Sequence, residues 1–174
     1  MDYKKLNNIT GWIILAIATI TYIATVESTA SFWDCGEFIA TAYNLEVGHP
    51  PGAPFFQMLG AFFAMFAFGD TQSIALMVNM MSVFSSAFTI LFMFWTITKI
   101  AGKLVIKDYN NLDKNKAIAV LGSAMVGALT FTYTDTFWFN AVETEVYAMA
   151  TFIMSLMFWL GLKWEENMDK PGGN

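Results

Sequence analysis

Four long apolar segments constrain the fold of this chain more than any other feature. They span residues 9–26, 73–97, 117–133 and 146–162. A helix needs about 20 apolar residues, within a range of roughly 17–25, to cross the hydrocarbon core of a bilayer. Only 13% of the residues are charged, whereas soluble domains carry about 25%. We therefore predict an all-α, polytopic transmembrane helical bundle with four spans.

A fifth apolar segment, residues 53–68, is uncharged but short, and three prolines, Pro50, Pro51 and Pro54, lie at its start. At a rise of 1.5 Å per residue a helix of this length covers about 24 Å, less than the roughly 30 Å core. If it crossed, the lysine-rich loop 99–116 would face outward, against the rule that lysine and arginine mark the cytoplasmic side. With four spans, every lysine is cytoplasmic. We therefore predict a cytoplasmic amino terminus and an outer-leaflet juxtamembrane helix at 53–68.

The first span has an alternative interpretation as a signal peptide. Lys4 and Lys5 give a positive start, and the small residues 28–30 resemble a cleavage site. The apolar stretch is slightly long for a signal peptide, which favours an uncleaved anchor. The polar stretch 168–174 is typical of a turn leading to a further segment. We expect residues 1–174 to form a single transmembrane domain, the amino-terminal part of a larger enzyme.

Charge and cysteine content exclude several classes of function. The net charge is −5, and all nine basic residues are lysine, which argues against nucleic acid as a partner. The single cysteine, Cys35, cannot form an internal disulfide. We interpret it as a small packing residue rather than a reactive thiol. One histidine and one cysteine fall short of a zinc site, and no metal is predicted.

The loop from Trp33 to Pro54 carries most of the candidate chemistry. Asp34 and Glu37 are three residues apart, which places both carboxylates on one face of a short helix that Ser31 can cap. Neighbouring negative charges beside a membrane raise the pKa of at least one carboxyl. Such a group can accept a proton from a hydroxyl. The alternative is a solvated acidic loop without catalytic function.

Two further regions fall on the same predicted side. His49 precedes a rigid Pro-Pro-Gly turn and is interpreted either as a contact to phosphate or substrate or as a structural residue. In the second outward loop, residues 134–147, Glu143 and Glu145 lie beside aromatic residues. They form either a second wall of the same site or part of an interfacial aromatic belt. Asn79, inside a span, is expected to make an interhelical hydrogen bond.

Three motifs together resemble a known family. They are Trp33-Asp34-x-Gly36-Glu37, Gly48-His49-Pro50-Pro51-Gly52-x-Pro54 and Trp138-x-x-Ala141-Val142-Glu143-x-Glu145. The chain resembles the amino-terminal portion of protein O-mannosyltransferase-like membrane glycosyltransferases of the GT-C fold. The third motif fits their bacterial branch, catalogued as domain of unknown function 2723. The resemblance covers nearly the whole chain.

This resemblance implies transfer of a mannose-like sugar from a polyprenyl-phosphate donor to an acceptor hydroxyl. The acceptor is a Ser or Thr of a secreted protein, on the non-cytoplasmic face of the bacterial inner membrane. No cofactor or metal is implied beyond the lipid-linked sugar. The family resemblance suggests roles for Asp34 as general base, Glu37 as its partner or an acceptor contact, His49 and Trp33 as substrate contacts, and Glu143 and Glu145 as the acceptor or sugar wall.

Two alternatives to an enzyme remain at this point. A non-enzymatic membrane subunit would use the aromatic loop to bind a partner complex. A transporter component would build an intramembrane site from Asn79 and the outer acids, but the paired broken helices of such proteins are not visible in the sequence. Members of the resembled fold have more than four spans and commonly a soluble outward domain, so a fragment is expected to be inactive alone.

Overall fold

The structure is a computed structural model that describes residues 2–50, 52–106 and 113–169. In this part of the chain, four helices are long and apolar enough to cross a membrane, which confirms the predicted all-α, four-span bundle. These are α1 (Tyr3–Thr25), α4 (Ile74–Val105), α5 (Lys114–Thr132) and α7 (Val146–Glu165). The helices run past the predicted apolar limits because lysine-bearing turns continue them at one end.

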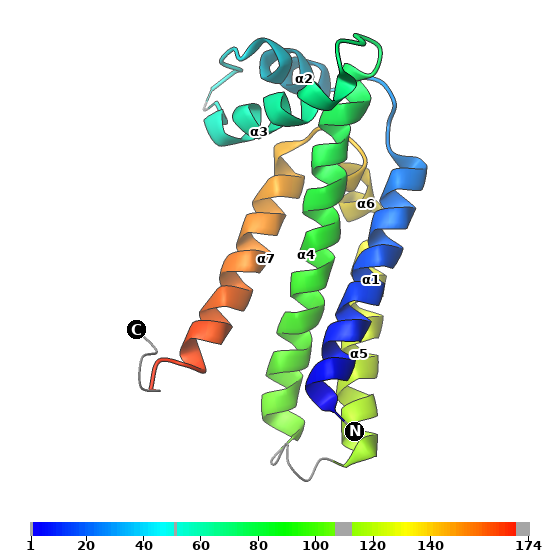
Figure 1. Cartoon of the computed structure of the whole chain (residues 1–174), viewed down its shortest axis with the longest axis vertical. Coiled ribbons are helices and arrows are strands. Elements are labelled where there is room, and N and C mark those ends of the chain that lie inside the picture. Colours follow the sequence, from blue (N-terminus) through cyan, green and yellow to red (C-terminus); the bar gives the residue numbers. More distant parts are fainter. Residues whose placement is uncertain (1, 51, 107–112, 170–174) are drawn as a thin grey trace.

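Helix α4 is the centre of the bundle, with α1, α5 and α7 packed around it (Figure 1). Ile14, Ala18 and Tyr22 of α1 are fully buried in the same core as Val83 and Ile90 of α4. Helix α1 thus packs as an integral part of this core, and the choice between anchor and signal peptide stays a prediction. Helix α7 is the least covered of the four, so most of its surface faces outward.

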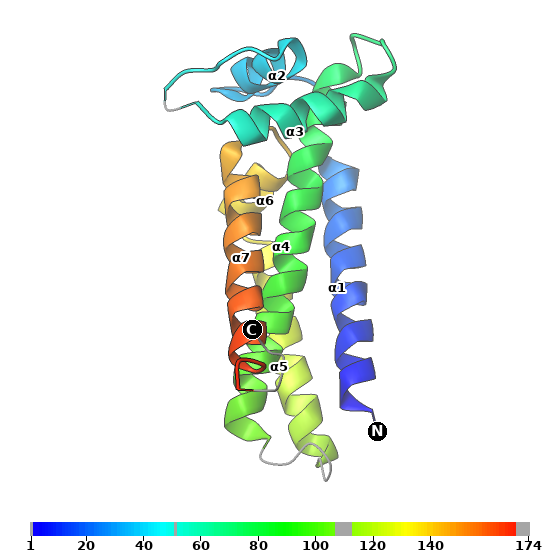
Figure 2. The same ribbon diagram turned by 60° about the vertical axis from the view of Figure 1, so that its left-hand side comes forward.

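Two short helices lie across one end of the bundle instead of running along it (Figures 1 and 2). They are α2 (Cys35–Asn44) and α3 (Pro54–Ala64), the latter continued by the short 3₁₀ helix η1 (Met65–Ala67). A Cβ on Gly60 of α3 would lie 2.8 Å from Cβ of Ala42 in α2, so glycine permits their close packing. The prediction that segment 53–68 does not run the length of the bundle is confirmed, whereas its depth in a membrane stays a prediction.

The two ends of the bundle differ in charge. The seven described lysines all lie on helix turns at the end opposite α2 and α3, called the lysine end below. They are Lys4, Lys5, Lys99, Lys103, Lys114, Lys116 and Lys163. Lys107 and Lys170 lie outside the described residues. The opposite end, called the acid end, carries α2, α3 and the turn 142–145. A four-span topology predicts this segregation of charge. The assignment of the lysine end to the cytoplasm stays a prediction.

Candidate functional site

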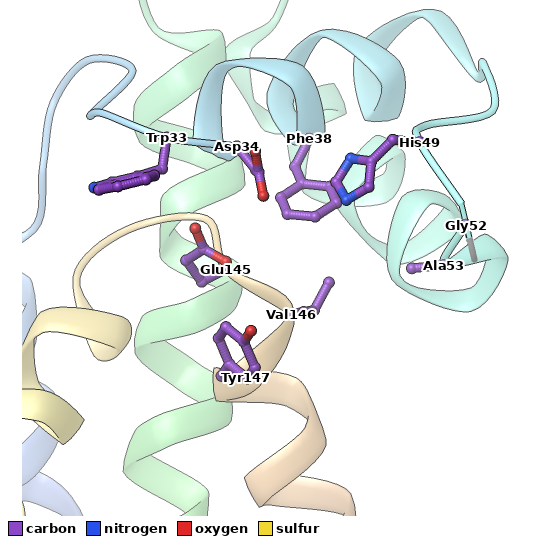
Figure 3. Close-up of a pocket in the computed structure, with 9 residues that line it drawn as sticks. All are labelled: Trp33, Asp34, Phe38, His49, Gly52, Ala53, Glu145, Val146 and Tyr147. Carbon is purple, nitrogen blue, oxygen red and sulfur yellow. The ribbon is translucent and has the colours of Figure 1, made fainter.

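The acid end contains a pocket of about 480 Å³ formed by the two loops that are predicted to face outward (Figure 3). Four of the predicted site residues line it: Trp33, Asp34, His49 and Glu145. Phe38, Gly52, Ala53, Val146 and Tyr147 complete the lining. The structure therefore brings the first and second loops together at one pocket. The roles of these residues toward a substrate stay predictions.

Asp34 lies at the first turn of α2, immediately after a tight bend in the chain. Trp33 has a φ of 65°, a left-handed conformation that is unusual for a bulky side chain, and its side chain is 89% exposed. Asp34 occupies the N-cap position of α2 without making a capping hydrogen bond from its side chain. Its carboxylate is therefore available to the pocket, and Figure 3 shows it pointing toward Glu145.

The predicted capping role of Ser31 is wrong. Its hydroxyl instead donates a hydrogen bond to the carboxylate of Glu143, which comes from the second loop. A hydrogen bond to a carboxylate is stronger than one between neutral groups, and this tertiary partner is invisible in the local sequence. Glu143 is 4% exposed, so it lies behind the pocket and not on its lining.

Glu37 binds the loop that carries His49. Its Oε1 accepts a hydrogen bond from the backbone N–H of His49 at 2.6 Å, and its Oε2 lies 3.1 Å from Nδ1 of the same residue. The backbone hydrogen bond first, and then the side-chain one, lower the pKa of Glu37 below its ordinary value. The rise expected for at least one carboxyl of this loop does not occur at Glu37. This residue positions His49, whose ring also packs on Phe38 with centroids 5.7 Å apart.

A second set of hydrogen bonds attaches this loop to α2 and α3. Gln57 donates to Thr41 Oγ1 at 2.7 Å, and Thr41 donates in turn to the carbonyl oxygen of Glu37 at 2.7 Å. A Cβ on Gly48 would lie 3.3 Å from both Gln57 Nε2 and Glu37 Oε1. Gly48 therefore lets the turn approach both side chains. Sequence analysis missed Thr41 and Gln57 because neither stands in a chemical motif.

Glu145 is the carboxyl whose pKa rises. Burial is the main cause, and the negative charges of Glu143 and Asp34 add to it. Cys35 donates a weak hydrogen bond to Glu145 Oε1 over 3.5 Å, and burial raises the pKa of this thiol to about 12. A neutral, fully buried thiol is a poor nucleophile. The structure supports the interpretation of Cys35 as a packing residue.

Asn79 of α4 links the two loops beneath the pocket. Its amide donates to the carbonyl oxygens of Glu27 at 2.7 Å and Thr29 at 3.1 Å, and its Oδ1 accepts from the hydroxyl of Thr144. Asn79 and Thr144 are both fully buried. The expected hydrogen bonding is present, but it runs to two loops and not to another spanning helix. The sequence signal for this hydrogen bonding was a single asparagine inside an apolar span.

Two groups of side chains have the donor atoms that a cation requires. They are Asp34 with Glu37 and His49, and Cys35 with Glu143 and Glu145, and within each group the atoms lie within 4.8 Å of one another. Carboxylate oxygens suit hard cations such as Mg²⁺ or Ca²⁺, which take six or more ligands. Each group has three residues, and Glu37 is already engaged by His49. The absence of a metal stays a prediction.

The pocket combines two carboxyls in different environments. Asp34 lies at an exposed helix start, whereas Glu145 is partly buried with a raised pKa. A carboxylate that makes no capping hydrogen bond can accept a proton in such a pocket. The fold and this pocket together define a polytopic membrane protein with a candidate acid–base site at one end of its spans.

Comparisons with known proteins identify the family. The model of the protein O-mannosyl-transferase TMEM260 N-terminal domain matches residues 34–174, and the chain belongs to this family. The predicted relationship to the amino-terminal portion of protein O-mannosyltransferase-like proteins is thereby confirmed. The matched region begins at Asp34, the residue placed at the start of α2.

Two relatives show how much of the family's proteins this chain represents. It is 26% identical over 144 residues to protein O-mannosyl-transferase tmem260 of Dictyostelium discoideum, covering 83% of this chain and 16% of that protein. It is 23% identical over 154 residues to protein O-mannosyl-transferase TMEM260 of Mus musculus, covering 88% of this chain and 19% of that protein. The chain thus spans less than a fifth of these relatives. No solved structure matches it.

Proposed function

We propose that this chain forms the amino-terminal, acid–base part of a GT-C-type membrane glycosyltransferase. The enzyme transfers a mannose-like sugar from a polyprenyl-phosphate donor to a Ser or Thr hydroxyl of a secreted protein. The observation that carries the proposal is the carboxylate of Asp34, held without a capping partner on a pocket formed by both outward loops. The names of the two relatives support the reaction class.

In the proposed reaction Asp34 is the general base. The acceptor oxygen forms a bond to the anomeric carbon while the bond from that carbon to the donor phosphate breaks. The hydroxyl proton passes to Asp34, and polyprenyl phosphate leaves with the bonding electrons. A single displacement inverts the anomeric centre, and a phosphate leaving group departs without protonation by a protein acid. The step therefore needs one base, which is what an uncapped carboxylate on a pocket wall can supply.

The other lining residues have complementary proposed roles. His49 is oriented by Glu37, and we assign it a contact to the lipid phosphate. Glu145 lines the pocket with Asp34, and we assign it a hydrogen bond to a sugar or acceptor hydroxyl, with Glu143 behind it. Trp33 provides an exposed aromatic surface for the substrate. A lipid-linked donor stays at the membrane surface, and the pocket lies at the end of the spans.

The decisive experiment is Asp34→Asn in the full-length protein, with sugar transfer and membrane insertion measured together. We expect transfer to fall by about 10²–10⁴-fold, the usual contribution of a general base, with insertion unchanged. Asp135→Asn is the matched control, because Asp135 is an exposed acid at the same end that does not line the pocket. Normal transfer by the Asp34 variant would exclude the enzyme proposal and favour a non-enzymatic membrane subunit.

The proposed orientation has a separate test. Cys35 is fully buried and is a poor target for labelling reagents. We therefore suggest Val47→Cys in a Cys35→Ala background, since Val47 is 90% exposed at the acid end. A membrane-impermeant thiol reagent added outside intact cells should label this cysteine and leave Asn115→Cys, at the lysine end, unlabelled. The reverse pattern would contradict a non-cytoplasmic site.

A further inference from the structure

A second pocket, of about 700 Å³, lies at the lysine end. It is formed by α1, α4 and α7 and shares no lining residue with the acid-end pocket. Helices α1 and α7 both pack on α4, so α4 forms the floor between them. Its volume falls in the range of about 300–1,000 Å³ that is usual for small-molecule sites. The sugar-transfer proposal assigns it no role.

Three tryptophans connect the walls of this pocket. Trp12 of α1 and Trp95 of α4 have ring centroids 5.9 Å apart, and Trp95 and Trp159 of α7 have centroids 5.5 Å apart. Tryptophan is enriched where a membrane protein meets the headgroup region, because its ring is apolar and its N–H is polar. These aromatic walls would suit the glycerol and upper acyl chain of a lipid.

The charge of the pocket favours an anion. Lys4, Lys99 and Lys163 line it together with one acid, Glu166. Glu166 pairs with Lys99 at 2.6 Å, whereas Lys163 lies over the ring of Trp159 with Nζ 5.5 Å from its centroid. Within residues 2–50, 52–106 and 113–169, no carboxylate forms an ion pair with Lys4 or Lys163. Two lysines from opposite walls thus have no carboxylate partner among the described residues.

The amide side chains in the pocket lining suit a ligand that carries both phosphate and hydroxyl groups. Asn7 and Asn8 of α1 line the pocket beside Lys4. An amide group can donate a hydrogen bond to a phosphate oxygen and accept one from a hydroxyl. The headgroup of phosphatidylglycerol has this combination of phosphate and hydroxyl groups.

We propose that this pocket binds the headgroup of an anionic glycerophospholipid, with its phosphate between Lys4 and Lys163. A bound lipid would bridge α1 and α7, which have few direct contacts with each other. The lysine end is also the end predicted to be cytoplasmic, where anionic lipids give the membrane surface a negative potential that attracts lysine. This site is independent of the acid-end chemistry and needs no sugar donor.

Native mass spectrometry of the full-length protein in detergent can test the proposal by titration with phosphatidylglycerol. The test variant is Lys4→Gln with Lys163→Gln. The matched control is Lys114→Gln with Lys116→Gln, which removes the same charge from the same end outside the pocket. At about 1 kcal/mol for each lysine near a lipid surface, the test variant should bind about thirtyfold more weakly. The control should bind within twofold of the unaltered protein.

Two competing ligands distinguish a lipid site from a free-anion site. Phosphatidylcholine should not compete with phosphatidylglycerol, and neither should millimolar inorganic phosphate. Equal weakening in the two double variants, or equal binding of phosphatidylcholine, would overturn the proposal. Displacement by inorganic phosphate would show a free-anion site and would also overturn it.

Discussion

The two ends of the bundle are held together by different interactions. At the acid end, buried side chains make hydrogen bonds to backbone and side-chain atoms far away in the sequence, as Asn79 does with Glu27, Thr29 and Thr144. At the lysine end, ion pairs such as Lys103 with Glu165 join side chains that are substantially exposed. Burial of polar groups is therefore concentrated at the end that carries the candidate site.

This difference shows which end needs a defined geometry. A buried polar group without a partner costs about 1–3 kcal/mol, so a network of such groups favours one arrangement over many. Exposed ion pairs contribute roughly 0–1 kcal/mol and tolerate many arrangements. The exposed ion pairs of the lysine end therefore place weaker geometric demands on the side chains that form them. The acid end has to hold Asp34, His49 and Glu145 around one pocket.

The largest effect on stability is expected from Asn79→Leu. Leucine has the same branching at Cγ but leaves the carbonyl oxygens of Glu27 and Thr29 and the hydroxyl of Thr144 without their partner. We expect a loss of about 1–3 kcal/mol, mainly from the buried hydroxyl of Thr144, with a smaller addition from the two part-buried carbonyl groups. The midpoint of thermal unfolding of the full-length protein in detergent measures this loss.

The same variant should also change the site, because Asn79 joins the two loops that form the pocket. Thr89→Val is the matched control: Thr89 is a buried polar residue of α4 whose hydroxyl bonds only to the carbonyl of Ser85 in its own helix. We expect the control to lose less than about 1 kcal/mol. Equal losses in the two variants would mean that the acid end is no more specifically organised than the middle of the bundle.

The sequence predicted the spans well because the bilayer imposes a strong length and polarity requirement. The segment 73–97 needs only hydropathy to be recognised as a helix, and the lysine distribution then excluded a fifth span at 53–68. The extension of α4 to Val105 was missed, because a helix that leaves the hydrocarbon core no longer needs apolar residues. Helix α6 (Asp135–Ala141) was missed for a related reason: seven residues are too short for a periodic signal.

Sequence analysis predicted most residues of the candidate site but not the contacts between them. The motifs and the predicted side of the membrane identified Asp34, His49, Glu145 and Trp33 as candidates. The structure places all four on one pocket. Their hydrogen bonds were not predictable, because they join residues that are far apart in the sequence. Ser31 illustrates this limit: local rules favoured a helix cap, whereas its partner Glu143 comes from the other loop.

A smaller effect is expected from pH, with opposite signs for two acids of the same end. The pKa of Glu37 is lowered from its ordinary value of 4.5 by hydrogen bonds to His49. Its stabilising effect is therefore fully present above that value and is lost as the pH falls through the lowered folded-state pKa. The pKa of Glu145 is raised from 4.5, mainly by burial. The contribution of Glu145 to folding stability is therefore most favourable below pH 4.5 and is lost as the pH rises through the raised folded-state pKa.

Thermal unfolding of Glu37→Gln and Glu145→Gln between pH 3 and pH 8 separates these contributions. Relative to the unaltered protein, the Glu37 variant should lose less stability on acidification below pH 4.5, and the Glu145 variant should lose less as the pH rises above 4.5. Glu46→Gln, an exposed acid of the same loop that does not line the pocket, serves as the control. Parallel pH curves for all the variants would contradict the two assigned environments.

The smallest effect is expected at the lysine end, from Lys103→Gln. The side chains of Lys103 and Glu165 are 39% and 54% exposed, so water and salt screen their attraction and the loss should be about 0.2–1 kcal/mol. Lys99→Gln should cost more, because the Lys99 side chain is only 12% exposed in its pair with Glu166. Added salt should reduce the Lys103 effect further, since screening acts most on exposed charges. If Lys103→Gln destabilised the protein as much as Asn79→Leu, the lysine end would have a defined geometry too, and the contrast between the two ends would fail.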